Sequence, residues 1–387
     1  MYISHLSLTN YRNFRHLELD LPPGLIFIFG ENGQGKSNLL EAAYLLTIAK
    51  SYRTNVEREL IHWSNQPPPG NIATSDSLAI PHTVVSGDIE YPDGKLRLIV
   101  ALQAISTEGV GGPLVKKQIR VNGVSTSAAG LLGCINGVLF TAADLDLIYG
   151  PPSKRRRFLD ILISQVDRGY LRALQRYQRV VTQRNHLLRL IRDGRNAPGD
   201  LDFWDNELIN EGSKVVAKRA EVTKSLAPLA MQAHSRLVDG EHLSIVFQPS
   251  VEAEELADLV PRHRETEIKA GMTLVGPHRD DLALDIDGMP AVTYASRGQA
   301  RTIALGLRLA EALFLRHQRQ EEPILLLDDI FSELDQQRRL RVLEQVVSYQ
   351  QTVVTLAESS LLRDAPVQPS LMSIIHSGQV YPWRYTE

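Results

Sequence analysis

Residues 30–38, GENGQGKSN, directly follow the apolar run at residues 25–29. A short apolar run before a glycine-rich loop predicts a buried strand, and the mostly apolar residues 38–50 after the loop predict a helix. A loop with the spacing G-x-x-x-x-G-K-S in this context is typical of a P-loop, whose backbone N–H groups hold phosphates at a helix N-terminus. The motif therefore predicts an α/β fold organised around a nucleotide.

Individual roles follow from the P-loop spacing. We expect Lys36 to reach the β- and γ-phosphates of ATP and Ser37 to ligate Mg²⁺. The other candidate nucleotide-binding residues of the motif are Gly30, Glu31, Asn32, Gly33, Gln34, Gly35 and Asn38. The alternative is a chance glycine-rich turn before a helix, against which the strand before the loop and the helix after it both argue.

A second apolar run, residues 323–327, ends in the acidic pair Asp328 and Asp329. This pattern predicts a buried strand with carboxylates at its end. We expect Asp328 to hold Mg²⁺ through water, and Asp329 to orient or deprotonate an attacking water. Lys36, Asp328 and Asp329 are thus the candidate catalytic residues. The alternative is a buried strand closed by a helix-capping Asp.

The stretch ASRGQAR, residues 295–301, has two interpretations. Ser296 and Gln299 match a capping box, which starts a helix. Gly298 weakens a first helical turn but allows close approach to the backbone, and a helix N-terminus attracts anions. Because the P-loop already holds a nucleotide, Ser296, Gly298 and Gln299 are candidate contacts to an ATP bound by a second subunit.

A strongly basic stretch coincides with helical periodicity. Residues 151–239 show apolar positions at helical spacing, interrupted by DGRNAPGD, which predicts an antiparallel helical hairpin. Residues 154–195 hold twelve basic and three acidic residues, a local charge of +9. Arg168, Arg172, Arg176 and Arg179 share one helical face, although Gly169 can end the row before Tyr170.

The planar guanidinium group of arginine can bind a phosphate through two hydrogen bonds. The sequence contains no motif that recognises bases alongside these arginines. Arg172, Arg176 and Arg179 are therefore candidate contacts to single- or double-stranded DNA, bound without regard to sequence. A solvated helix face is the alternative interpretation of the same residues.

Composition narrows the class of protein. The net charge is −3, the single cysteine excludes an internal disulfide, and no apolar stretch approaches the roughly 20 residues of a membrane span. The first strand-like pattern begins almost at Met1, so we expect no cleaved leader. These features predict a cytoplasmic protein.

The remaining chain divides by its periodicity. Residues 1–29 predict strands, residues 83–125 an antiparallel sheet, and residues 66–80 a polar surface loop. We expect residues 1–150 and 299–387 to form one ATPase lobe, split by a helical lobe at residues 151–298. The segment GPHRDD, residues 276–281, has the residue types of a metal site but poor ligand spacing. A turn or a contact network is the favoured interpretation there.

These motifs, in their order, resemble the ABC-type ATPase heads of the SMC-like class and, over essentially the full length, the RecF family of bacterial recombination mediators. The residues that carry the resemblance are NYRNF at 10–14, the P-loop, DLDLI at 144–148, RRRFLD at 155–160, GPHRDD, the Ser296 motif and LLLDDIFSELD at 325–335. The resemblance implies an α/β ABC-type head with mixed β-sheets and an inserted helical arm.

The resemblance also implies function. It predicts an ATP-dependent homodimer that clamps DNA in recombinational repair and SOS induction, with RecR and RecO as partners. Arg12 and Asn13 are expected beside the nucleotide, and residues 332–335 opposite the second subunit. Asp329 stands where many ABC ATPases have Glu, which is one methylene longer, so slow hydrolysis is expected. Thr355 lies near the position where transporters carry a switch histidine, so the resemblance assigns no γ-phosphate sensor there.

Other functions fit the same residues less well. A transporter subunit does not account for the basic stretch, and a small-molecule kinase does not need the Ser296 motif. An ATP-binding scaffold with little hydrolysis, or the nucleotide-binding subunit of another ABC-type machine, stays open as an alternative.

Overall fold

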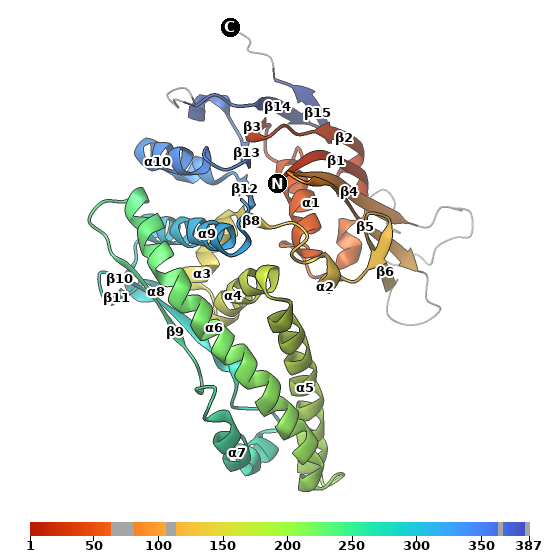
Figure 1. The fold of residues 1–387 in the computed structure, drawn as a ribbon, viewed down its shortest axis with the longest axis vertical. Coiled ribbons are helices and arrows are strands. Elements are labelled where there is room, and N and C mark those ends of the chain that lie inside the picture. Colours follow the sequence, from red (N-terminus) through yellow and green to blue (C-terminus); the bar gives the residue numbers. More distant parts are fainter. Residues whose placement is uncertain (63–80, 106–113, 363–366, 384–387) are drawn as a thin grey trace. The chain divides into compact units, whose positions relative to one another are not determined.

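The computed structural model describes residues 1–62, 81–105, 114–362 and 367–383 (Figure 1). The chain forms two compact units: residues 1–142 with 315–387, and residues 143–314. The sequence predicted lobe boundaries after residues 150 and 298, which differ from the limits of these units. The lobe boundaries therefore stay a prediction. The expected surface loop at residues 66–80 lies outside the described residues.

The first unit holds an antiparallel sheet of six strands in the order β2-β1-β4-β5-β6-β7. The strands are β1 (Tyr2–Tyr11), β2 (Phe14–Asp20), β4 (His82–Tyr91), β5 (Gly94–Ile105), β6 (Leu114–Val121) and β7 (Val124–Thr126). Between β6 and β7, Asn122 and Gly123 both have positive φ, 49° and 81°, as a tight two-residue hairpin turn requires. The antiparallel sheet predicted from residues 83–125 is confirmed in its described part.

The second sheet of this unit is mixed, in the order β15-β14-β3-β13-β12-β8. Its strands are β3 (Gly24–Phe29), β8 (Gly137–Phe140), β12 (Ile324–Asp328), β13 (Gln351–Leu356), β14 (Leu371–His376) and β15 (Gln379–Pro382). β13 pairs in parallel with both β3 and β12, so the carboxyl ends of β3 and β12 reach the same edge of the sheet. Ligands in such sheets bind at this edge.

Helices and short turns complete the first unit. α1 (Lys36–Ile48) begins inside the P-loop, and α10 (Gln336–Val346) follows β12. Shorter elements are η1 (Glu57–Leu60), α2 (Ala128–Leu131), η6 (Ile330–Glu333) and η7 (Ser359–Leu362), with η3 (Ala142–Leu145) at the boundary between the units. Nearly all of α1 is buried, which explains why its sequence is mostly apolar rather than amphipathic.

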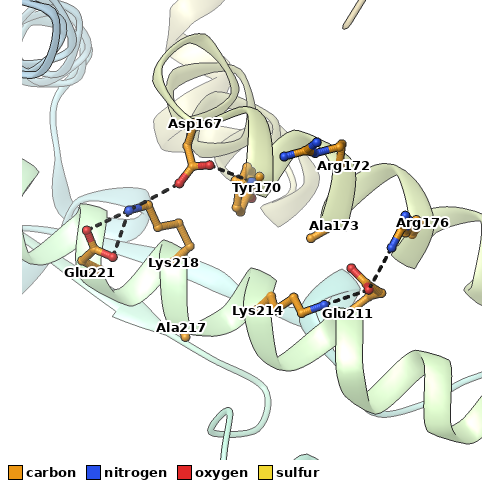
Figure 2. A pocket seen from close by; sticks show the side chains of 11 residues that line it. Asp167, Tyr170, Arg172, Ala173, Arg176, Glu211, Lys214, Ala217, Lys218 and Glu221 are labelled. Carbon is orange, nitrogen blue, oxygen red and sulfur yellow. Dashed lines mark hydrogen bonds and ion pairs between the residues drawn. The ribbon is translucent and has the colours of Figure 1, made fainter.

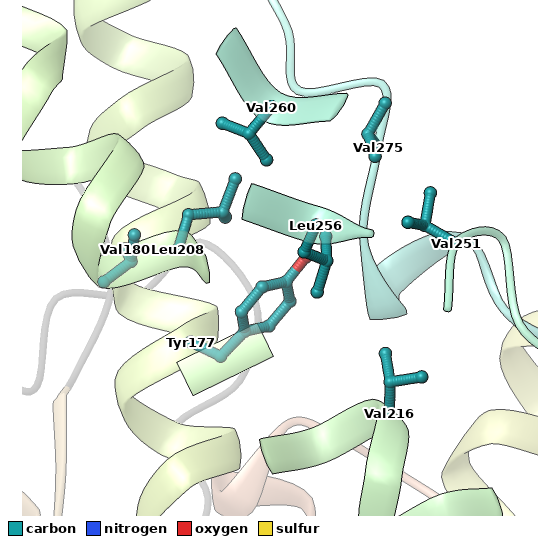
Figure 3. Close-up of a cluster of buried hydrophobic side chains, with 8 residues drawn as sticks. All are labelled: Tyr177, Val180, Leu208, Val216, Val251, Leu256, Val260 and Val275. Atoms are coloured by element: carbon teal, nitrogen blue, oxygen red, sulfur yellow. The ribbon is translucent and has the colours of Figure 1, made fainter. Parts of the chain in front are cut away.

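The second unit is built on the predicted hairpin, α5 (Arg168–Arg192) and α6 (Asp202–Leu237), joined through η4 (Pro198–Leu201). Gly169 does not interrupt α5, because Asp167 caps the helix by accepting the Tyr170 backbone N–H at 2.9 Å. Tyr177 and Leu208 of the two helices pack together with Leu256 of α7 (Leu256–Ala270), as Figure 3 shows. The apolar positions of the hairpin therefore face a shared core.

The rest of the second unit contains a sheet that the sequence pattern did not indicate. Three strands, β9 (Leu243–Gln248), β10 (Asp281–Ile286) and β11 (Met289–Pro290), lie within the lobe expected to be helical. The other helices of this unit are α3 (Asp146–Tyr149), α4 (Pro152–Val166), α8 (Ala291–Tyr294) and α9 (Arg297–Arg319), with the turn η5 (Pro277–Arg279); the last residues of α9, from 315 on, belong to the first unit. β9 and β10 pair although more than thirty residues separate them, so no local hairpin signal marks them.

None of the helices in the described ranges has both the length and the apolarity to cross a membrane.

Candidate functional site

The P-loop surrounds the amino group of Lys36. This nitrogen donates hydrogen bonds to the carbonyls of Gly30 at 2.5 Å and Glu31 at 3.0 Å, and only 5 % of the residue is exposed. Burial lowers the pKa of Lys36, while the nearby Asp329 and Asp328 carboxylates oppose that shift. The lysine is thus held at the loop by weak carbonyl partners that a phosphate can replace.

Two glycines of the loop are required by its geometry. Gly30 and Gly35 have φ of 153° and 118°. A Cβ at Gly30 would lie 2.6 Å from the Ile375 carbonyl oxygen, and one at Gly35 would lie 2.5 Å from the Asn13 amide nitrogen. Side chains at either position would therefore distort the loop.

The two residues expected beside the nucleotide have different surroundings. Asn13 braces the loop, because its Nδ2 donates to the Gln34 carbonyl at 2.9 Å and its Oδ1 accepts from Asn38 Nδ2 at 2.7 Å. The Arg12 guanidinium instead forms two hydrogen bonds, 2.9 and 2.8 Å, with the fully buried carboxylate of Glu41 on α1. Arg12 therefore positions α1, a pairing that sequence reasoning did not foresee.

Three hydroxyl groups converge on the Asp328 carboxylate. Ser37 Oγ donates to Oδ1 at 2.9 Å, Thr355 Oγ1 donates to the same oxygen at 3.0 Å, and Tyr52 donates to Oδ2 at 3.0 Å. Hydroxyl and carboxylate oxygens are the ligands that Mg²⁺ prefers, so the donor set of Ser37 and Asp328 fits this ion. Tyr52 was missed because no motif marks it.

Asp329 lies directly after this carboxylate, in the left-handed region at φ 50°. Its backbone N–H donates to Thr355 Oγ1 at 3.0 Å. Within the described part of the chain, its Oδ1 is buried and accepts no hydrogen bond. Burial raises the pKa of Asp329, and Asp328 adds to the shift while Lys36 opposes it. An unsatisfied oxygen with a raised pKa is suited to accept a proton from water.

The Ser296 motif forms the predicted capping box at the start of α9. The Gln299 N–H donates to Ser296 Oγ at 3.2 Å, and the Ser296 N–H donates to Gln299 Oε1 at 2.9 Å. Ser296 is exposed and Gly298 is half-buried. The capping interpretation is confirmed, and the helix N-terminus faces solvent within its own unit.

Comparison with known proteins assigns the chain to a family. The profile of the family described as "RecF/RecN/SMC N terminal domain" matches residues 2–378. A Roseiflexus castenholzii protein named DNA replication and repair protein RecF is 37% identical over 99% of this chain and 100% of its own length. The chain belongs to the RecF family.

Other relatives agree with this membership. Proteins named DNA replication and repair protein RecF from Moorella thermoacetica and Geobacillus thermodenitrificans are 38% and 35% identical over 95% and 98% of this chain, and over 93% and 99% of their own lengths. A solved structure of the recombination mediator protein RecF with ATP, in the RecFOR pathway, is 28% identical. Its TM-score is 0.86, covering 99% of this chain and 98% of that one.

The fold class is also shared more widely. An Smc head bound to the C-terminal winged helix domain of ScpA matches with a TM-score of 0.55 at 15% identity, covering 99% of this chain and 98% of that one. At that identity the likeness concerns the fold alone. The predicted ABC-type head, with mixed β-sheets and an inserted helical arm, is confirmed by these similarities.

The arm arginines of this RecF-family chain differ in their surroundings. Arg172, Arg176 and Arg179 are exposed on α5. Arg172 and Arg176 line a groove between α5 and α6 (Figure 2). Across it, the buried Glu211 carboxylate lies 3.7 Å from an Arg176 nitrogen and 2.9 Å from Lys214 Nζ. The groove therefore alternates positive and negative groups, and Arg176 is partly neutralised.

Part of the basic stretch is not available to a partner at all. Arg155 is bound by both oxygens of Asp281, at 2.7 and 2.8 Å. The Arg184 side chain is completely buried, 2.7 Å from Asp205 and 2.6 Å from Glu267. The local charge of +9 thus overstates the exposed charge, because the compensating acids lie elsewhere in the sequence.

Residues 276–281 belong to a contact network inside the second unit. Asp280 is fully buried and accepts from Arg219 at 3.0 Å and from the Ser250 N–H at 2.9 Å. His278 Nδ1 lies 2.6 Å from the Tyr177 hydroxyl, and burial lowers the pKa of this histidine. These contacts support the contact-network interpretation, and they join η5 to α5 and α6.

Proposed function

We propose that this chain is an ATP-dependent DNA-binding protein of recombinational DNA repair and replication restart, acting in the cytoplasm. The observation that carries the proposal is the arrangement of Lys36, Ser37 and Asp328 at one sheet edge. The names of its relatives, DNA replication and repair protein RecF, and the likeness to RecF with ATP support it.

ATP and Mg²⁺ are the proposed cofactors. The loop from Gly30 to Asn38 holds the phosphates through backbone N–H groups and Lys36, with Asn13 bracing its outer side. Ser37 and Asp328 hold the Mg²⁺ ion, which supplies neutralisation of the charge that develops on the phosphates. Asp329 orients the attacking water and accepts its proton. Because its side chain is one methylene shorter than Glu, turnover is slow.

Two chains close around two ATP molecules in this proposal. Each Ser296 hydroxyl and Gly298 N–H contacts the γ-phosphate held by the other chain's P-loop, with Gln299 fixing the helix start. Residues 332–335 face the opposite chain. ATP binding thus drives dimerisation, and hydrolysis reverses it.

DNA is bound through its backbone by the arm, with Arg172 and Arg179 as the strongest candidates and Arg176 contributing less because of Glu211. Dimerisation clamps the DNA and hydrolysis releases it, supporting recombinase loading and SOS induction. RecR and RecO are the proposed protein partners, since a similar structure is described within the RecFOR pathway.

Sedimentation with ATP, ADP or no nucleotide, each with and without duplex DNA, together with ATPase assays with and without DNA, tests this function. We expect dimers only with ATP, and ATP turnover that changes with DNA. ATP-driven dimers without measurable turnover favour the alternative, an ATP-binding scaffold, for which the short Asp329 side chain is the supporting observation. Monomers under all conditions contradict the proposed ATP-driven clamp.

A further inference from the structure

A chain of polar side chains connects α6 to the first turn of α9. His234 on α6 is fully buried, and its Nε2 lies 3.1 Å from Oε2 of Glu241. The other Glu241 oxygen accepts from Gln299 Nε2 at 3.1 Å. Gln299 Oε1 in turn accepts from the Ser296 N–H at 2.9 Å. All four residues lie in the second unit.

The Glu241 carboxylate determines which way the Gln299 amide points. An ionised carboxylate offers only acceptors, so the NH₂ group of Gln299 must face it. The amide oxygen is then directed at the Ser296 N–H, which completes the capping box. With the amide reversed, the NH₂ group would oppose that N–H, and two donors would face each other.

The surroundings hold Glu241 in place. Its side chain is 18% exposed, in the short connection between α6 and β9. The next residue is fixed as well, because the His242 N–H donates to Asp287 Oδ1 at 2.9 Å. α6 and α9 also approach closely, since a Cβ at Gly306 would lie only 3.2 Å from His234 Cβ. Through its contact with His234, the carboxylate is therefore held next to the place where the two helices approach closely.

We propose that Glu241 is a positioning residue for the Ser296 motif. It fixes the Gln299 amide, and through it the hydroxyl and N–H groups that meet the γ-phosphate of a nucleoside triphosphate bound by a second copy of this chain. Through His234, Glu241 also connects the first turn of α9 to α6, which lines the groove beside Arg172 and Arg176. The role at the phosphate rests on the function proposed above.

The test compares Glu241→Gln with Glu265→Gln, a matched change at an exposed position on α7. Hydrogen exchange of peptides covering residues 295–302 is measured by mass spectrometry, together with ATP affinity of the monomer and ATP-driven dimerisation. In Glu241→Gln we expect about tenfold faster exchange at the helix start and a dimer dissociation constant raised about tenfold, the equivalent of one hydrogen bond. Monomer affinity for ATP and the Tm stay as in the unmodified protein.

A double variant, Glu241→Gln with Gln299→Glu, should restore the hydrogen bond between the two positions with the amide and the carboxylate exchanged. The introduced amide donates to the introduced carboxylate, whose second oxygen accepts from the Ser296 N–H. Slow exchange at residues 295–302 should return, whereas a role of the Glu241 charge in general stability gives no such return.

Unchanged exchange in Glu241→Gln, or no recovery in the double variant, overturns the positioning role. If exchange behaves as expected but the unmodified protein does not dimerise with ATP, the function proposed above fails while the control of Gln299 by Glu241 stands.

Discussion

Ser37 Oγ lies 2.9 Å from a carboxylate oxygen of Asp328, although the two residues are 291 positions apart in the chain. They meet because β3 and β12 both pair in parallel with β13 and end at the same sheet edge. The candidate magnesium ligands are therefore brought together by the sheet, although residues 143–314 are inserted between them in the sequence.

Lys36→Met should abolish ATP binding and leave the fold intact. Among the described residues, the Lys36 amino group donates hydrogen bonds to oxygens of the loop itself, from Gly30, Glu31 and Asn32, so its loss removes phosphate contacts and breaks no hydrogen bond to another element. Isothermal titration with ATP measures the effect, with Lys50→Met, an exposed lysine, as the control. ATP affinity equal to that of the control would show that the loop does not hold the nucleotide.

Replacing Arg172 and Arg179 with Gln should weaken DNA binding about equally for all sequences. The slope of log K against log salt should become shallower by about 0.9 for each phosphate that an arginine no longer neutralises. Adding Arg176→Gln should change the slope less, because Glu211 already neutralises part of its charge. Fluorescence anisotropy with labelled duplexes over a salt series measures these slopes.

The control for the arm is Arg262→Gln, an exposed arginine on α7. It should leave the salt slope unchanged. An unaltered slope in the Arg172 and Arg179 variant would show that this face is only solvated and that DNA contacts another surface.

Asp329→Asn should alter the pH dependence of both turnover and stability. Because burial raises the pKa of this carboxyl, the protonated form stabilises the fold, and that stabilisation is lost as pH rises through the folded-state pKa. An Asn side chain cannot ionise, so the variant keeps its free energy of unfolding as the pH rises and should be more stable than the unmodified protein at neutral pH. The difference between the two proteins should vanish below pH ~4, near the pKa of an unfolded Asp.

The same substitution should lower the rate of ATP turnover, although it raises stability at neutral pH. Loss of the base should abolish hydrolysis while ATP binding persists, and in the unmodified protein turnover should fall on the acid side as Asp329 becomes protonated. Urea unfolding and phosphate release between pH 4 and 8 measure the two effects. Full turnover in Asp329→Asn would remove this residue from the mechanism.

Arg219→Gln should destabilise the second unit by about 3–5 kcal/mol, because it leaves buried carboxylates without their cation. Arg219 is almost completely buried, at 2.8 Å from Asp160 and 3.0 Å from the fully buried Asp280. Urea unfolding followed by circular dichroism measures the change, and Arg262→Gln serves again as the surface control. A loss below about 1 kcal/mol would mean that water or a rearrangement satisfies both acids.

The features that were predictable from sequence are local ones. The P-loop, the apolar strand before Asp328 and the capping box at Ser296 each depend on residues a few positions apart, so spacing alone indicated them. The helical hairpin was predicted for the same reason, because its apolar residues recur at helical spacing. These elements make up the greater part of the candidate site.

The features that were missed depend on distant partners. The charge of Arg155 and Arg184 is cancelled by Asp281, Asp205 and Glu267, which no local window includes. Strands β9 and β10 pair across α7, and no turn sequence joins them. Tyr52 donates a hydrogen bond to Asp328, although the two residues are 276 positions apart in the sequence. Only the tertiary fold reveals such contacts.

The central claim is that ATP is shared between the P-loop of one chain and the Ser296 motif of another. Ser296→Arg costs a capping hydrogen bond, about 0.5–2 kcal/mol, but in a shared site it also places a bulky cation against the partner's loop. Each monomer of this variant should bind ATP normally and fail to dimerise. In a mixture of Ser296→Arg and Lys36→Met chains, a mixed dimer carries both defects in one site and leaves the other intact.

Sedimentation of this mixture with ATP is the most direct measurement of that claim. We predict partial recovery of dimers in the mixture and none in either variant alone. If Ser296→Arg alone dimerises with ATP as the unmodified protein does, the motif is only a helix cap, and the proposed sharing of ATP between chains is contradicted.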